Sequence, residues 1–123
     1  MKQTTEQYRA KAAWQQVSSI NVDDEFLSSA NGAASLIQSA GLGQAVAFWL
    51  AKGGKHIYLV NFLAQWLLKD AHANEIDKRK TGKHLMEHVT QIDSTKYRHL
   101  TTEAIAYLGW VKRFAKANQE NHK

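Results

Sequence analysis

Three side chains in the second half of the chain have the types and spacing of a metal-dependent hydrolase. His84, Glu87 and His88 form the pattern H-x-x-E-H. On a helix, histidines four residues apart lie on one face, where both can bind a zinc ion beside a glutamate that acts as general base. Such short patterns recur by chance, and no clear distal acid completes a ligand set. We therefore favour two exposed histidines beside an acid, expect no metal or other cofactor, and keep a metallohydrolase as an alternative.

No other catalytic constellation is evident in the sequence. The chain has no cysteine, which excludes a disulfide framework, a thiolate nucleophile and a cysteine zinc site. Gly41-Leu42-Gly43 matches part of a dinucleotide fingerprint, but no strand precedes it and Val46 stands where the third glycine belongs. Nothing in the residues specifies a reaction, so from them alone we infer a binding or assembly module.

The strongest binding signal lies in residues 94–116, the longest periodic run of the chain. At about 100° per residue, one face carries four positive charges and no acid, and it consists of Arg98, Thr102, Gly109, Lys112, Arg113 and Lys116. Cations at one-turn spacing can displace counterions from a nucleic-acid backbone. The alternative is a solvated face whose charges suit the C-terminal end of the helix dipole. The helix by itself does not decide between the two.

The opposite face of the same run is apolar, as expected for a helix that packs on a core. It consists of Tyr97, Leu100, Ala104, Tyr107, Leu108, Val111, Phe114 and Ala115. Glu103 lies at the flank, beside Trp110. The tryptophan stands at the edge of the apolar stripe and fits either the core or an interface.

The charge of the chain is uneven along its length. The net charge is +5 with neutral histidines. Residues 1–53 are balanced, whereas residues 94–123 hold six basic and two acidic side chains. This excess predicts an acidic partner, of which nucleic acid is the commonest case.

The elements that position these residues are all predicted to be helical, because proline is absent and strand formers are scattered. The 123 residues predict a single domain, 1–123. We expect helices over residues 4–20, 24–39 (with a possible split at Asn31-Gly32), 41–51, 56–71, 81–91 and 94–116. An exposed loop at 70–80 and a frayed polar tail at 118–123 complete the chain. The fold is therefore predicted to be a compact all-α bundle of five to six helices with a long C-terminal helix.

Two of these segments carry further expectations. After Gln44, residues 45–51 are apolar all round, which predicts a central helix in the core and a buried Gln44 amide that bonds to protein groups. No apolar run approaches the roughly 20 residues of a membrane span, and the N-terminus is polar. We therefore expect a soluble, cytoplasmic protein with no membrane contact.

Two stretches resemble a known family. SLIQSAGLGQAVAFWLAKG (residues 35–53) and YRHLTTEAIAYLGWVKRFAKA (residues 97–117) are similar to the small subunit of the type III-B CRISPR effector, the Cmr RNA-targeting complex. Together they cover about a third of the chain. The matching residues are Gly41, Leu42, Gln44, Ala47, Phe48 and Leu50 in the first stretch, and Thr101 or Thr102, Glu103, Ala104, Ile105, Ala106, Leu108, Trp110, Lys112, Arg113, Phe114 and Ala115 in the second.

The resemblance implies a compact all-α bundle without catalytic activity. Target-RNA cleavage belongs to the backbone subunit of that complex. Copies of the small subunit would stack head to tail in a minor filament, beside the backbone filament that holds the guide RNA, and would meet the large subunit. They would line the channel that holds the duplex of guide RNA and target RNA.

The same resemblance indicates which residues are candidates for RNA binding. Lys112 and Arg113 are predicted contacts because the chain and the family motif agree there. Arg98 and Lys116 follow from helical geometry, and Lys52 and Lys55 are expected near the same channel. The contact would be electrostatic and independent of sequence, because guide pairing reads the target. The alternative is a small helical DNA-binding regulator, although the cations of residues 94–116 lie at the wrong end for a recognition helix.

Overall fold

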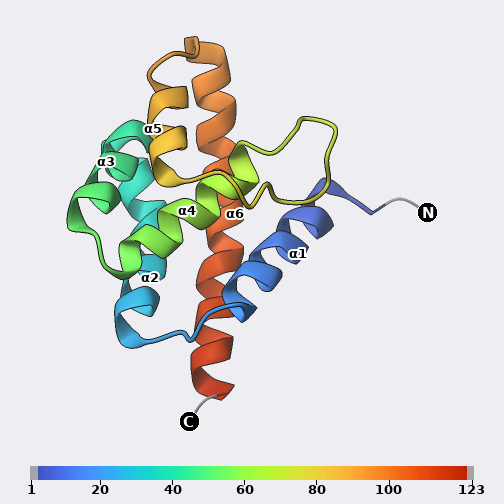
Figure 1. Cartoon of the computed structure of the whole chain (residues 1–123), viewed down its shortest axis with the longest axis vertical. Coiled ribbons are helices and arrows are strands. Elements are labelled where there is room, and N and C mark those ends of the chain that lie inside the picture. Colours follow the sequence, from blue (N-terminus) through green and yellow to red (C-terminus); the bar gives the residue numbers. More distant parts are fainter. Residues whose placement is uncertain (1–2, 122–123) are drawn as a thin grey trace.

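The computed structural model describes residues 3–121, which form six helices and no strand (Figure 1). The helices are α1 (Thr5–Ser18), α2 (Asp24–Ala40), α3 (Leu42–Lys52), α4 (Lys55–Leu67), α5 (Gly82–Val89) and α6 (Ser94–Asn121). The predicted all-α fold with a long C-terminal helix is confirmed. Within residues 3–121, no helix combines the length and the hydropathy that crossing a bilayer requires.

Side chains of the preceding loops determine where three of the helices begin. Thr4 and Gln7 form a capping box, in which the Gln7 backbone N–H donates to Thr4 Oγ1 at 3.1 Å. Asp23 Oδ1 accepts from the Phe26 N–H at 2.8 Å, and Asp93 Oδ1 accepts from the Lys96 N–H at 2.9 Å. These short polar residues satisfy helix N–H groups that have no partner within the helix.

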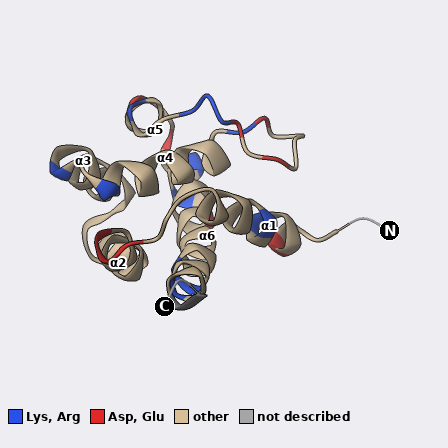
Figure 2. Ribbon diagram, turned by 60° about the horizontal axis from the view of Figure 1, so that its bottom comes forward, with Lys and Arg blue, Asp and Glu red and all other residues tan. Residues whose placement is uncertain are grey.

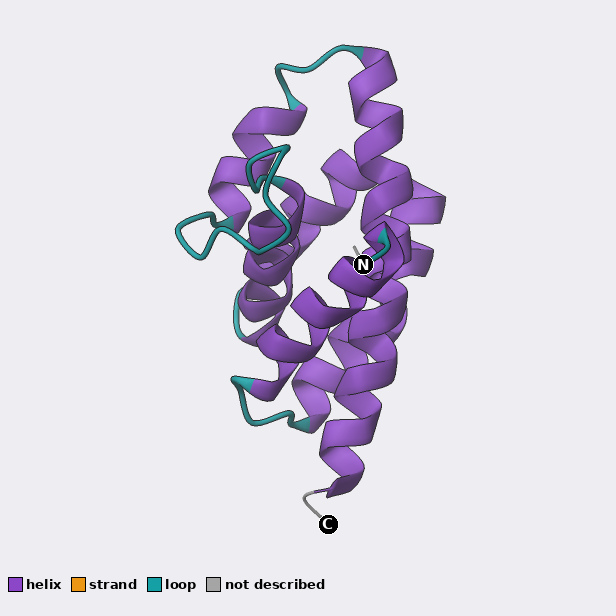
Figure 3. Cartoon of the chain, turned by 90° about the vertical axis from the view of Figure 1, so that its right-hand side faces the viewer, coloured by secondary structure: helices purple, strands orange, loops and turns teal. Residues whose placement is uncertain are grey.

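Helix α6 is the longest of the six helices, and it packs most extensively against α1 and α2 (Figures 1 and 3). Its predicted apolar stripe lies in the core, where Ala104, Tyr107, Leu108, Val111 and Ala115 are fully buried. Large side chains from α2, α3 and α4 complete the interior.

Helix α2 runs without a break through Asn31 and Gly32, so the possible split does not occur. Ala30 and Ala33, on either side of the pair, are buried at helical spacing. Packing of this small-residue face outweighs the roughly 1 kcal/mol by which an internal glycine disfavours a helix.

Helix α3 is amphipathic, and the prediction that it is buried all round is wrong. Leu42 and Trp49 are buried, whereas Gln44 and Phe48 are exposed, the latter by 42%. The helix packs on α2, α4 and α5 from one side only. The Gln44 amide therefore faces solvent.

The C-terminal helix is longer than the sequence indicates. It continues to Asn121, so residues 118–121 of the expected frayed tail are helical, and residues 122–123 lie outside the described part of the chain. Gln119 Nε2 donates to Asp24 Oδ1 at 2.6 Å. This bond joins the last turns of α6 to the start of α2.

Candidate nucleic-acid interface

The outer side of α6 presents the cations that the sequence places on one face. We call Arg98, Thr102, Gly109, Lys112, Arg113 and Lys116 the basic face. All four of its charged side chains are exposed. The face extends over about 27 Å, at 1.5 Å per helical residue. Figure 3 shows α6 running the length of the molecule, with the long α4–α5 loop on the other side of the view.

No acid neutralises the basic face among the side chains that the structure describes. The ion pairs formed by residues 3–119 involve other cations, namely Arg9, Lys55 and Arg79. The Thr102 hydroxyl donates to the Arg98 carbonyl at 3.1 Å, and a Cβ atom at Gly109 would meet nothing within 4 Å. The face is thus cationic and thinly covered between its charges.

Glu103, at the flank of this face, is turned toward α1 and bound there. Arg9 donates to both of its carboxylate oxygens, at 2.5 and 2.8 Å, and Trp66 Nε1 donates to Oε2 at 2.8 Å (all three side chains are partly or fully buried). Burial by itself raises the pKa of Glu103, but the bonds from Arg9 and Trp66 and the charge of Arg9 together hold that pKa below its ordinary value. The charge of Glu103 is therefore already compensated by groups of this chain.

The sequence alone does not predict this pairing. The position of Arg9 on α1 is outside the apolar stripe, and a partner 94 residues away leaves no local signal. Only the crossing of α1 over α6 brings the two side chains together (Figure 1).

Lys52 and Lys55 lie apart from the basic face. They stand at the α3–α4 connection, on the far side of α2 from the C-terminal half of α6 (Figures 1 and 2). Lys55 Nζ is 3.7 Å from Asp23 Oδ2 and 4.9 Å from the centre of the Tyr58 ring. The acidic start of α2 therefore separates Lys55 from α6, and the structure does not bring the six predicted cations onto one surface.

A cluster of aromatic rings borders the basic face at the seam between α1 and α6. We call Trp14, Trp110 and Phe114 the aromatic cluster. Trp14 meets Phe114 edge-on with 5.1 Å between ring centres, and Trp110 stacks on Phe114 at 5.5 Å. The Arg113 guanidinium lies 6.0 Å from the centre of the Trp110 ring. Trp110, which the sequence left open between core and interface, is half-buried.

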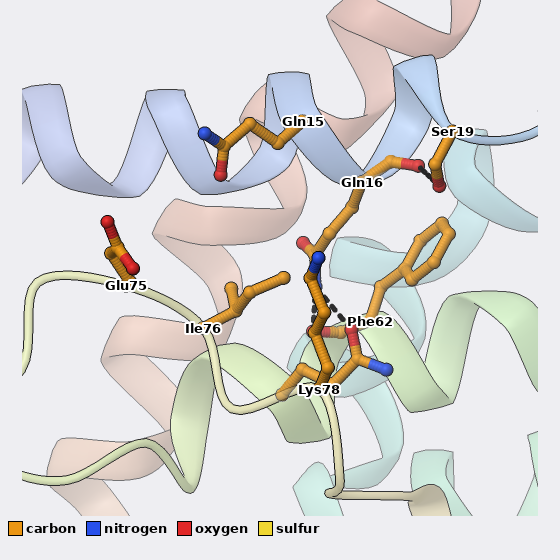
Figure 4. A pocket seen from close by; sticks show the side chains of 8 residues that line it. Gln15, Gln16, Ser19, Phe62, Glu75, Ile76 and Lys78 are labelled. Atoms are coloured by element: carbon orange, nitrogen blue, oxygen red, sulfur yellow. Dashed lines mark hydrogen bonds between the residues drawn. The ribbon is translucent and has the colours of Figure 1, made fainter.

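The pocket between α1, α4 and the α4–α5 loop has a polar floor (Figure 4). Gln16 Nε2 donates to the Phe62 carbonyl and to Gln65 Oε1, both at 3.0 Å, and Gln16 Oε1 accepts from the Tyr107 hydroxyl. Burial raises the pKa of Tyr107 well above its ordinary value, so this hydroxyl remains a donor. These polar atoms are satisfied by one another and hold α1, α4 and α6 together.

The histidine pattern does not form a metal centre in the described residues. His84 Nδ1 accepts from the Thr81 backbone N–H at 3.0 Å, as part of the cap of α5. A neutral imidazole that accepts at Nδ1 carries its proton on Nε2, which then cannot ligate a metal. Within residues 3–121, no three His, Asp or Glu side chains are grouped as ligands. The metallohydrolase alternative has no support in this geometry.

Fold and site together define a small all-α protein in which one long helix exposes a cationic face that has no acidic partner among the described side chains. A family model described as CRISPR-associated protein (Cas_Cmr5) matches residues 5–118. The chain therefore belongs to the Cmr5 family of CRISPR-associated proteins, and the resemblance to the small subunit of the type III-B Cmr complex is confirmed. Other Cmr subunits are accordingly its partners.

A solved structure supports the same assignment. The crystal structure of a CRISPR-associated Cmr5 family protein from Thermus thermophilus matches with a TM-score of 0.79 and 30% sequence identity, over 94% of this chain and 97% of that one. No curated protein sequence matches the chain.

Proposed function

We propose that this chain is a non-catalytic structural subunit of a type III-B Cmr complex whose basic face contacts the backbone of the guide–target RNA duplex. The observation that carries the proposal is the row of four exposed cations on α6 without a described acidic partner. Copies of the chain stack as a minor filament and line the channel that holds the duplex. The contact is electrostatic, because side chains of this kind neutralise phosphates without reading bases.

The geometry favours Lys112, Arg113 and Lys116 as the centre of this contact. They occupy two successive turns, so their charges reach neighbouring phosphates together. Arg98 extends the same face toward the start of α6. Lys52 and Lys55 belong to a separate surface, and we propose that Lys52 makes at most a peripheral contact.

The test is reconstitution of the complex with wild-type protein or with the variant Lys112→Glu, Arg113→Glu. We expect the variant to assemble and to bind target RNA more weakly. The slope of log K against log salt should shrink by about 1.4 or more, because two phosphate contacts are lost. Binding of target RNA is measured at several salt concentrations.

A matched control is the variant Lys78→Glu, Lys83→Glu, which changes the net charge equally. Both lysines are exposed and belong to the α4–α5 loop and α5, away from α6. An equal loss in both variants would assign the effect to net charge and refute a local contact. Assembly with unchanged RNA binding in the α6 variant would show that the basic face is only solvated.

A further inference from the structure

The aromatic cluster places a large exposed ring next to the cations of α6. Trp14 is 46% exposed, although burial of its ring would stabilise the fold. Trp14 and Phe114 pack in a T-shaped arrangement, and Phe114 in turn stacks on the half-buried Trp110. The chain thus leaves a large ring accessible at the α1–α6 seam, supported from below by two others.

The aromatic cluster and the basic face are parts of one surface. Trp110 and Phe114 lie in the same two turns of α6 as Lys112, Arg113 and Lys116. The Arg113 guanidinium already lies over the Trp110 ring at 6.0 Å. On α1, the exposed Lys11 stands three residues before Trp14 and adds a cation on the same side of that helix.

We propose that the aromatic cluster stacks an unpaired nucleobase of an RNA strand whose phosphates are held by the basic face. This proposal rests on the proposed function and adds a second mode of recognition to it. Surfaces that bind single-stranded nucleic acid combine cations that follow the backbone with aromatic rings on which bases stack. Every base has a π face, so such a contact is independent of sequence.

The charges of this surface favour RNA over a protein partner. A protein that covered Trp14 and Trp110 would also remove water from Arg113 and its neighbours, which is unfavourable unless acids pair with them. Glu103, the acid at the flank of the basic face, is already bound by Arg9. A nucleotide supplies both the stacking plane and the compensating charge in one ligand.

The experiment compares two single-stranded RNA oligonucleotides of equal length, one of uridines and one abasic, with the full-length chain at low salt. The abasic strand keeps the phosphates but has no bases. We expect tighter binding of the uridine strand by on the order of 5- to 100-fold, the range of one base stacked on an aromatic ring. Trp14→Ala should reduce this preference severalfold, and Trp14→Phe should restore most of it.

Two comparison variants separate stacking from charge and from folding. Phe48→Ala removes an exposed ring of similar accessibility on α3 and should keep the preference. Lys112→Glu, Arg113→Glu should weaken both oligonucleotides by the same factor. If that variant binds both as tightly as wild type does, the proposed function fails, and the stacking proposal fails with it.

Three results would overturn the stacking proposal alone. If wild type binds both strands equally and its affinity still falls with salt as expected, the basic face binds RNA but the aromatic cluster does not stack a base. If Trp14→Ala prefers the uridine strand over the abasic strand as strongly as wild type does, the base stacks on another part of the protein. A Trp14→Ala variant that no longer joins the reconstituted complex, yet keeps its preference for bases, would make the cluster a protein interface.

Discussion

Gly109 has no side chain, so another molecule can approach the helix backbone most closely at this position of the basic face. A Cβ atom there would meet nothing within 4 Å, and the same is true of Gly32 on α2. Both glycines lie inside helices, where glycine is about 1 kcal/mol less favourable than alanine. Neither position needs glycine for the fold of the single chain.

We predict that Gly109→Ala and Gly32→Ala each raise the free energy of unfolding, by about 0.5 to 1 kcal/mol. Urea denaturation measures this change. In the reconstituted complex, Gly109→Ala should weaken binding of target RNA, because the added methyl group holds the backbone away. Gly32→Ala, which lies on α2 and outside the basic face, serves as the control. Unchanged RNA affinity in Gly109→Ala would show that this glycine is not a point of close approach.

The buried Tyr107 hydroxyl donates to Gln16 Oε1, in the polar floor of the pocket between α1, α4 and the α4–α5 loop. Tyr107→Phe removes the hydroxyl and leaves Gln16 Oε1 buried without its donor. We expect a loss of about 1 to 3 kcal/mol in the free energy of unfolding, the usual effect of such an orphaned group. Chemical denaturation measures it.

Tyr97→Phe is the matched comparison for that variant. The Tyr97 hydroxyl accepts from the Gly43 N–H at 2.8 Å near the surface, where water can replace it. A loss in Tyr97→Phe as large as that in Tyr107→Phe would contradict the importance of burial.

The burial of Gln16 has a signal in the sequence. Gln16 stands among Ala12, Ala13 and Val17, which are buried at helical spacing, but the sequence analysis did not use this pattern.

At the scale of the elements, the pair Arg9–Glu103 joins α1 to α6. Because the folded-state pKa of Glu103 is lowered, its charge stabilises the fold above the ordinary value of 4.5. That stabilisation is lost as the pH falls through the lowered pKa. The stabilisation from the charge of Glu103 does not change as the pH rises above neutral.

We therefore predict that Glu103→Gln lowers the melting temperature at neutral pH, with a loss of about 1 kcal/mol in stability for a partly exposed pair. The difference from wild type should shrink as the pH decreases from about 5 to about 3. Thermal unfolding monitored by circular dichroism over this range checks the prediction. A difference that stays constant with pH would mean that packing, and not charge, holds α1 in place.

The elements also show how far the sequence predicts the fold. The expected starts of the first two helices, at residues 4 and 24, lie within one residue of the observed starts of α1 and α2, because the caps at Thr4 and Asp23 are local features. The side on which α3 is covered did not follow, since an apolar run is compatible with burial on one side or on all sides. For the candidate site, periodicity placed the basic face on one side of α6, but it could not relate α6 to the α3–α4 connection.

At the scale of the whole molecule, the six cations predicted to bind RNA are divided between two surfaces. The basic face lies on α6, while Lys52 and Lys55 stand at the α3–α4 connection, where Lys55 Nζ is 3.7 Å from Asp23 Oδ2 at the acidic start of α2. If the RNA follows α6, the second surface contributes little to its affinity. A cation that already has a carboxylate nearby also releases fewer counterions.

We accordingly predict that Lys52→Glu weakens target-RNA binding by less than Lys112→Glu does. The salt slope of the complex should change by about 0.7 or more for Lys112→Glu and by clearly less for Lys52→Glu. Filter binding or anisotropy at several salt concentrations measures both. Equal changes would mean that RNA contacts both surfaces, as the resemblance implied.

The sequence by itself determined the helical class, the long two-faced helix and the family. These depend on local spacing, on caps and on residue types, each of which acts over a few neighbouring positions. The tertiary structure decided which groups meet: Glu103 with Arg9 and Trp66, Gln16 with Tyr107, and Trp14 with Phe114. Such contacts depend on how distant helices cross, and side-chain packing between helices fixes that crossing only when the whole chain is folded.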